Sequence, residues 1–148
     1  MPYAPGTLKA VGVRGDRAVA ESVLTTAGQA ATLRITADRT DVKADGQDLS
    51  YLIVEAVDAE GRLQPNDDQE VQFSISGPGT IAAVGNGDGQ DDASYHGDRR
   101  KLYQGRALVV VRTSRESGPI TVKAATPGLS DGSVTIHSSP AAERAELR

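Results

Sequence analysis

Cysteine and tryptophan are absent from the 148-residue sequence, and its aromatic side chains are four tyrosines and one phenylalanine, Phe73. Without cysteine, disulfides, thiolate catalysis and cysteine-ligated zinc are all excluded. A core with so few rings must be built from valine, isoleucine, leucine and alanine. The buried disulfide and tryptophan that are typical of antibody domains are excluded as well.

A basic stretch and a long apolar run are also missing. The formal net charge is −4, and nucleic acid is not expected as a partner because its binding needs clustered lysine and arginine. No apolar run approaches the ~20 residues that a membrane-spanning helix requires. The first ten residues lack the charged start and apolar centre of a signal peptide. We therefore expect no nucleic-acid or membrane partner, and the compartment stays open.

Short segments in which apolar and polar residues alternate run through the whole sequence. Residues 8–13 and 18–25 flank the polar turn Arg14–Arg17, which predicts a β-hairpin. The Arg-Gly-Asp tripeptide in this turn is explained by the needs of the turn itself. No segment shows helical periodicity over a useful length. Further strands are predicted at residues 32–36, 49–57, 70–76, 80–84, 107–113, 120–125 and 133–137. This spacing predicts an all-β protein with an immunoglobulin-like β-sandwich, preceded by the hairpin.

The segment 49–57 has the strongest strand pattern in the sequence. Leu52, Val54 and Ala56 share one face of the predicted strand, and Tyr51, Ile53 and Val57 share the other. Apolar residues on both faces indicate a central strand.

Residues 85–105 form a long polar loop that offers a first candidate site. Asn86, Asp88, Asp91 and Asp92 place several hard oxygen ligands within seven residues, and calcium favours such clusters. The spacing lacks the EF-hand pattern and its terminal glutamate. Asparagine and aspartate beside glycine also suit a turn-rich loop without a ligand. Calcium is therefore one hypothesis for this loop, and a loop without a cofactor is the other.

A second candidate site in the same loop combines tyrosine, histidine and arginine: Tyr95, His96, Arg99, Arg100 and Tyr103. Tyrosine can stack on a sugar ring and hydrogen-bond its hydroxyls, which makes carbohydrate contact one interpretation. The absence of tryptophan argues against a strong carbohydrate platform. Packing against a neighbouring domain is the second interpretation, since long loops often carry function. A loop that does neither is the third.

No catalytic residue is predicted. The glutamates that could serve as acids or bases are scattered over turns and solvent-facing positions: Glu21, Glu55, Glu60, Glu70 and Glu116. The two histidines, His96 and His137, lie far apart in the sequence. Nothing resembles the nucleophile elbow of a serine hydrolase.

Two parts of the sequence resemble the C-terminal region of bacterial glycoside hydrolase family 2 β-galactosidases. Residues 3–12, with 19–21 and 26–28 downstream, are similar to the last hairpin of the immunoglobulin-like domain that follows the catalytic barrel. The final C-terminal immunoglobulin-like domain of the same enzymes is similar to a second set of segments: residues 33–39, 44–50, 76–79 and 85–88. Together the resemblance covers roughly residues 3–137.

This resemblance implies a domain organisation. Residues 1–29 would be the terminal hairpin and linker of a preceding immunoglobulin-like domain. Residues 30–137 would be the C-terminal sandwich, and residues 138–148 a disordered tail. The catalytic barrel of the family resembles nothing in this chain, so no catalytic residue carries over.

The function implied is that of a non-catalytic accessory module of a β-galactosidase-type enzyme, with the other domains of that enzyme as packing partners. Two alternatives stay open. One is a carbohydrate-binding module that uses the 85–105 loop. The other is an adhesin-like bacterial immunoglobulin repeat without an attached enzyme.

Overall fold

The computed structural model describes residues 4–141, and all regular secondary structure in that range is β. These residues form eleven strands: β1 (Thr7–Arg14), β2 (Arg17–Thr25), β3 (Thr32–Ala37), β4 (Asp41–Ala44), β5 (Leu49–Val57), β6 (Glu70–Ser76), β7 (Gly79–Gly85), β8 (Arg99–Lys101), β9 (Arg106–Thr113), β10 (Gly118–Ala125) and β11 (Gly132–Pro140). The predicted all-β class is confirmed. Residues 4–141 contain no helix that could cross a membrane.

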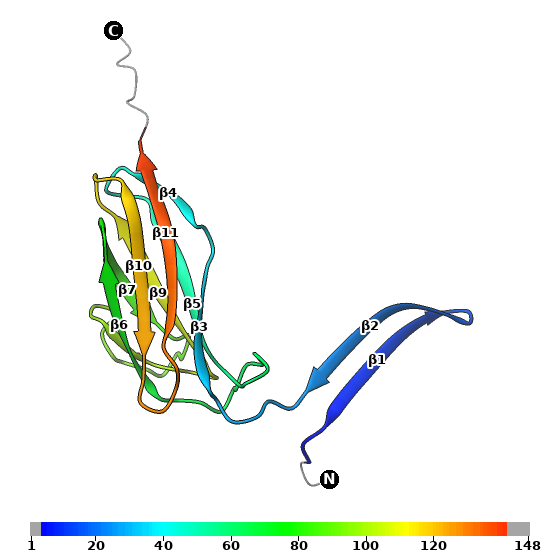
Figure 1. The fold of residues 1–148 in the computed structure, drawn as a ribbon. Helices are drawn as coiled ribbons and strands as arrows, with labels where there is room; N and C mark the ends of the chain where they lie inside the picture. The colour runs from blue at the N-terminus through cyan, green and yellow to red at the C-terminus, as the bar shows by residue number, and fades with distance from the viewer. Residues whose placement is uncertain (1–3, 142–148) are drawn as a thin grey trace.

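Two of the three sheets stack face to face as a sandwich (Figure 1). One has five strands in the order β4-β11-β10-β6-β8, and the other has four in the order β3-β5-β9-β7. Neighbouring strands are antiparallel except β11 and β4, which run parallel. This arrangement is the predicted immunoglobulin-like sandwich.

The core lies between the two sheets and is almost entirely aliphatic. Alternation along each strand sends every second side chain inward. Leu52 and Val54 of β5, Val109 of β9 and Val122 of β10 are completely buried, and Phe73 is the one aromatic ring in the core of the described residues. Each such side chain contributes about 1.5–3 kcal/mol relative to exposure. The composition therefore predicted the character of the core correctly.

The predicted end of the last strand and the predicted start of the tail need correction. The strand predicted to end at His137 continues to Pro140, because residues 137–140 pair with β4. The first residues of the predicted disordered tail, 138–140, are therefore part of a strand. Of the rest of that prediction, Ala141 lies outside any strand, and residues 142–148 lie outside the described residues.

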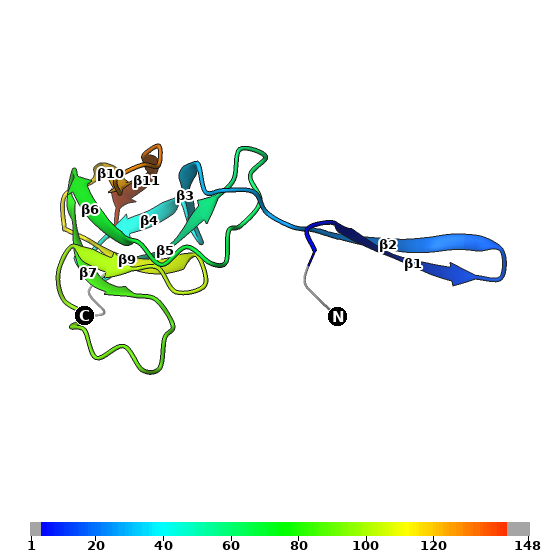
Figure 2. The same ribbon diagram turned by 90° about the horizontal axis from the view of Figure 1, so that it is seen from below.

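The predicted hairpin is present as β1 and β2, and it projects away from the sandwich (Figures 1 and 2). Gly15 has a φ of 62° in the connecting turn, a conformation that favours glycine. The register shifts between Gly12 and Val13. In the end-on view of Figure 2, the loop that follows β7 extends from the same sheet as β9.

Candidate functional site

The loop between β7 and β8 is shaped by short side chains that bind its own backbone. Asn86 Oδ1 accepts a hydrogen bond from the N–H of Asp88 at 3.0 Å, and Asp88 Oδ1 accepts one from Gln90 at 2.9 Å. Asp91 Oδ1 accepts one from Ala93 at 2.9 Å. The hydrogen bond from the N–H of Ala93 holds the pKa of Asp91 below its ordinary value, and the hydrogen bond from the side chain of Asn86 lowers it further. These oxygens thus stabilise turns of the loop.

Arg100 of β8 holds the loop in place through contacts of its buried side chain. Its side chain is only 2% exposed. Nη1 donates to the carbonyls of Ala93 and Ser94 at 2.9 and 3.3 Å, and Nη2 lies 3.2 Å from Asp91 Oδ2. The guanidinium also lies 5.2 Å from the centre of the Tyr95 ring, a distance at which cation and ring attract. The loop is therefore folded around a buried arginine.

The structure separates the residues that the sequence grouped as a carbohydrate or packing site. Arg100 and Tyr95 come together, but Arg100 is buried and its donors are directed into the loop. His96 is exposed, and Arg99 is an exposed partner of Glu70 at 3.8 Å. Tyr103 lies beyond β8 in a tight turn with Arg106.

The four predicted calcium ligands do not form a compact set of free carboxylates. Asp91 is paired with Arg100 and accepts from Asn86 Nδ2 at 2.8 Å, while Asp92 is exposed. Among residues 4–141 no group of three or more histidine, aspartate or glutamate side chains is placed to hold a metal ion. The calcium site stays a prediction.

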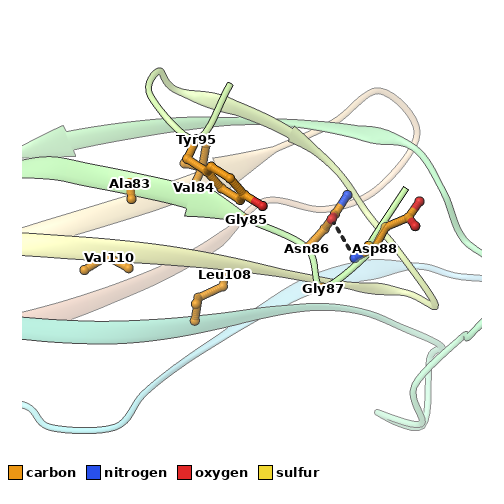
Figure 3. A pocket seen from close by; sticks show the side chains of 10 residues that line it. Ala83, Val84, Gly85, Asn86, Gly87, Asp88, Tyr95, Leu108 and Val110 are labelled. Carbon is orange, nitrogen blue, oxygen red and sulfur yellow. Dashed lines mark hydrogen bonds between the residues drawn. The ribbon is translucent and has the colours of Figure 1, made fainter. Parts of the chain in front are cut away.

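A cavity of about 360 Å³ lies between this loop and the outer face of the four-stranded sheet (Figure 3). Its floor is formed by Ala83, Leu108 and Val110, and Tyr95 stands at its side. Asn86 and Asp88 lie at its rim. Sequence reasoning found Tyr95 but missed the floor, which consists of the outward residues of two strands.

The linker between hairpin and sandwich is fixed by Asp58, a residue that sequence reasoning also missed. Asp58 Oδ2 accepts a hydrogen bond from the N–H of Gly28 at 2.9 Å, and Oδ1 accepts from Glu60 and Arg62 at 3.0 and 2.8 Å. Gln64 Nε2 donates to the carbonyl of Gly28 at 2.6 Å. The N–H of Gly28 is the main reason that the pKa of Asp58 lies below its ordinary value. We call this set of contacts the linker clamp.

The two faces of the hairpin differ in character. Lys9 is opposite Val23 and Glu21 is opposite Val11 on one face, where Lys9 and Glu21 form a diagonal ion pair at 2.9 Å. The other face has no charged residue between the linker and the register shift, where it consists of Leu8, Ala10, Gly12, Ala20, Ser22 and Leu24; beyond the shift, Arg14 is paired with Arg17. We call the part before the shift the uncharged hairpin face. Leu8 and Leu24 are opposite each other on it, and both are 69% exposed.

Comparison with known proteins gives a consistent result. The model of the family described as glycoside hydrolase family 2 C-terminal domain 5 matches residues 33–135. The chain is 36% identical over 127 residues to the β-galactosidase BoGH2A of Bacteroides ovatus, covering 86% of this chain and 15% of that protein. It is also 36% identical over 137 residues to a β-glucuronidase of Formosa agariphila, covering 91% of this chain and 14% of that protein.

A solved structure supports the same relationship. A glycosyl hydrolase family 2 member from Bacteroides cellulosilyticus matches with a TM-score of 0.89 and 40% identity over 94% of this chain and 18% of that one. Because this match leaves out only 6% of the chain, it must include most of the hairpin as well as the sandwich. This chain thus spans less than a fifth of the length of these relatives.

Proposed function

Since the chain belongs to the glycoside hydrolase family 2 C-terminal domain 5 family, we propose that it is a non-catalytic accessory module that packs against other domains of a family 2 glycosidase. The resemblance seen in the sequence is confirmed by this membership. The relatives are several times longer than this chain, so an enzyme of their kind has a large body for the module to pack against. Family membership also favours this function over that of an adhesin-like repeat.

The observation that carries the proposal is the uncharged hairpin face. A two-stranded hairpin is marginally stable in water by itself, and here Leu8 and Leu24 extend into solvent. The linker clamp fixes the backbone of Gly28 where the hairpin leaves the sandwich. A hairpin with one face uncharged over most of its length and a fixed point of attachment suits a docking element that completes a neighbouring β-domain.

The carboxylates of the chain support a non-catalytic role. Glu55 binds Arg34 at 2.7 Å and Arg106 at 3.0 Å. Partial burial raises its pKa, but the hydrogen bonds and charges of the two arginines outweigh burial and lower the pKa overall. A glycosidase acid needs a raised pKa and a second carboxyl group ~5–5.5 Å away in a retaining enzyme. Glu55 is instead held ionised by its neighbours.

Activity assays on two forms of the protein test the non-catalytic role. The isolated 148-residue chain is expected to hydrolyse neither a nitrophenyl β-galactoside nor a nitrophenyl β-glucuronide. The native polypeptide, purified from its source and weighed by mass spectrometry, is expected to be several times larger and to hydrolyse one of them. We propose the galactoside, on the relationship to BoGH2A.

Footprinting tests the packing role. Photoactivated carbene is expected to label Leu8 and Leu24 in the isolated chain and to label them several-fold less in the native polypeptide. Turnover by the isolated chain would refute the proposal. So would a native polypeptide without a catalytic domain, or equal labelling of the two leucines in both forms.

A further inference from the structure

The outer faces of the two stacked sheets differ sharply in polarity. On the five-stranded sheet the outward residues at the centre are polar: Ser74, Thr121, Lys123, Ser133, Thr135 and His137. On the four-stranded sheet the outward residues at the centre are apolar: Tyr51, Ile53, Ala83, Leu108 and Val110. We call the second set the outer patch. A sheet that faces water on one side normally alternates apolar inward and polar outward residues. The outer patch breaks this rule, so we expect another protein segment to cover it.

The strand register makes the outer patch continuous. Tyr51 pairs with Val110, which pairs with Ala83, while Ile53 pairs with Leu108 in the adjacent row. Directly opposed side chains on one face lie about 4.5–5.5 Å apart. Tyr51 is 43% exposed and Ile53 is 47% exposed. The patch is thus an unbroken apolar strip across β5, β9 and β7.

The loop after β7 turns one end of the strip into a groove. Leu108 is paired with Gly85, whose missing side chain leaves room on the outer face. A Cβ atom at Gly85 would lie 3.9 Å from the ring of Tyr95. The loop therefore forms a wall beside the floor of Ala83, Leu108 and Val110, and encloses the cavity of about 360 Å³ (Figure 3).

The chemistry of the groove suits an apolar protein segment better than a sugar. A sugar site needs free polar groups at defined positions. At this rim, both polar atoms of Asn86 and one carboxylate oxygen of Asp88 already bind the loop. One side of the Tyr95 ring is occupied by Arg100. The floor of the groove is aliphatic, and its burial by other apolar side chains is favourable.

The charged residues at the two ends of the strip indicate which charges a covering segment would carry. At one end, Arg34 and Arg106 flank the single carboxylate of Glu55. At the other end, Arg112 is exposed two residues beyond Val110 on the same face of β9, and no ion pair of Arg112 occurs within residues 4–141. Both ends are therefore cationic. Two copies packed face to face along the strands would bring cationic ends together, which disfavours a second copy as the cover.

From these observations we infer that the outer patch is a second docking surface, occupied by an apolar segment with flanking carboxylates from another domain of the same glycosidase. The inference rests on the proposed function and adds to it a surface that is separate from the hairpin. The relatives, of which this chain spans 14–15%, are long enough to supply such a segment.

Carbene footprinting of the native polypeptide and of the isolated chain tests this surface. Labelling of Tyr51, Ile53 and Leu108 is expected to be several-fold lower in the native polypeptide. Labelling of Thr121 and Lys123 on the polar outer face serves as the reference and is expected to stay equal. Equal labelling of Ile53 in both forms would overturn the inference. If Leu24 were protected in that experiment while Ile53 was not, the proposed function would stand without the second surface.

A pair of matched variants tests the same surface by changing its residues. Ile53→Lys places a cation in the middle of the strip, and Thr121→Lys makes the same kind of change on the polar face. Both are expected to change the urea midpoint of the isolated chain little, because Ile53 is 47% exposed and Thr121 is half-buried on an outer face. The bond that Thr121 loses is a surface hydrogen bond to the hydroxyl of Thr135. In the native polypeptide, Ile53→Lys is expected to restore labelling of Leu108 to the level of the isolated chain, whereas Thr121→Lys is not. Continued protection of Leu108 in the Ile53→Lys polypeptide would count against the inference.

Two measurements on the isolated chain address the other occupants. Loss of Tyr95 and Leu108 labelling on addition of galactose, lactose or galactan would assign the groove to carbohydrate and overturn the inference. Loss of Ile53 labelling as the concentration of the chain rises would assign the surface to a second copy, and would overturn it as well. Labelling that is independent of both additions is the expected result.

Discussion

Asp58 and Arg100 are the two buried charged residues among the residues described, and both hold irregular segments in place. Asp58 binds three backbone N–H groups and the side chain of Arg62. Arg100 binds two carbonyls and Asp91. A buried charge is tolerated only when it is paired and hydrogen-bonded. At the scale of single residues, these two side chains therefore define the linker and the long loop, where no ladder of strand hydrogen bonds can do so.

The linker clamp predicts how stability depends on pH. The pKa of Asp58 is lower in the folded chain than the ordinary aspartate value of about 3.9. Ionised Asp58 therefore stabilises the fold above that ordinary value, and the contribution is lost as the pH falls through the lower folded-state pKa. Asp58→Asn is expected to reduce the melting temperature at pH 7 and to flatten its decline below about pH 4. Thermal unfolding followed by circular dichroism between pH 2 and pH 7 measures both effects.

A matched control removes the same charge away from the clamp. Asp16 lies exposed in the turn of the hairpin, and Asp16→Asn is expected to reproduce the melting curve of the unchanged chain across this pH range. Identical pH profiles for Asp58→Asn and the unchanged chain would show that the clamp does not stabilise the ionised carboxylate.

Individual elements differ in how far they could be predicted from sequence. Residues 49–57 were predicted as a strand with the bounds that β5 has, because the alternation is long and the turn after Val57 is clear. The segments Asp41–Ala44 and Arg99–Lys101 were missed as strands. They are short and polar, and they become strands through pairing with β11 and β6. Their structure is a property of the partner strand, which local sequence does not reveal.

The candidate sites show the same division between local and non-local information. The loop after β7 was predicted as long and polar, and its asparagine and aspartate residues do form the turns that such residues favour. Which residues meet was not predictable, because only the position of β8 brings Arg100 against Asp91, Ala93 and Ser94 earlier in the loop. Apolar residues on both faces of residues 49–57 predicted a central strand, and β5 does lie inside its sheet, between β3 and β9. That Tyr51 and Ile53 lie on the outer face, opposite Val110 and Leu108 of the cavity floor, required the tertiary structure.

The loop as an element is expected to depend on Arg100. Arg100→Met keeps the length of the side chain but removes its bonds to Ala93, Ser94 and Asp91. The carboxylate that remains, Asp91, is partly exposed and keeps its bonds from Asn86 and Ala93. The main cost is the loss of a partner for the carbonyls of Ala93 and Ser94, so we expect a loss of about 2 kcal/mol in the free energy of unfolding. Urea denaturation measures the loss, and amide hydrogen exchange of residues 86–98 is expected to accelerate.

Arg99→Met serves as the control on the same short strand. Arg99 is exposed, and its ion pair with Glu70 is long, at 3.8 Å, so its replacement is expected to change stability by less than about 0.5 kcal/mol. If Arg100→Met behaved like Arg99→Met, the loop would be held by its turns alone.

At the scale of the whole molecule, the sandwich has the core that it needs to be stable by itself, and the hairpin does not. The sandwich encloses a continuous aliphatic core. The hairpin has no second layer, and every residue of β1 and β2 is exposed. A two-stranded ribbon of this kind gains little from folding alone. The same polypeptide therefore combines a self-sufficient body with an extension whose stability depends on what it docks against.

Deletion of residues 1–26 tests this division. The deletion removes the hairpin but retains Gly28 and its bonds to Asp58 and Gln64. We expect the free energy of unfolding of the isolated chain to change by less than about 0.5 kcal/mol, because the core between the stacked sheets is untouched. In the intact chain, amides of β1 and β2 are expected to exchange far faster than those of β5 and β9, whose opening requires global unfolding. A clear fall in the urea midpoint after the deletion, or protection of the hairpin amides equal to that of β5, would show that the hairpin belongs energetically to this sandwich and not to a neighbouring domain.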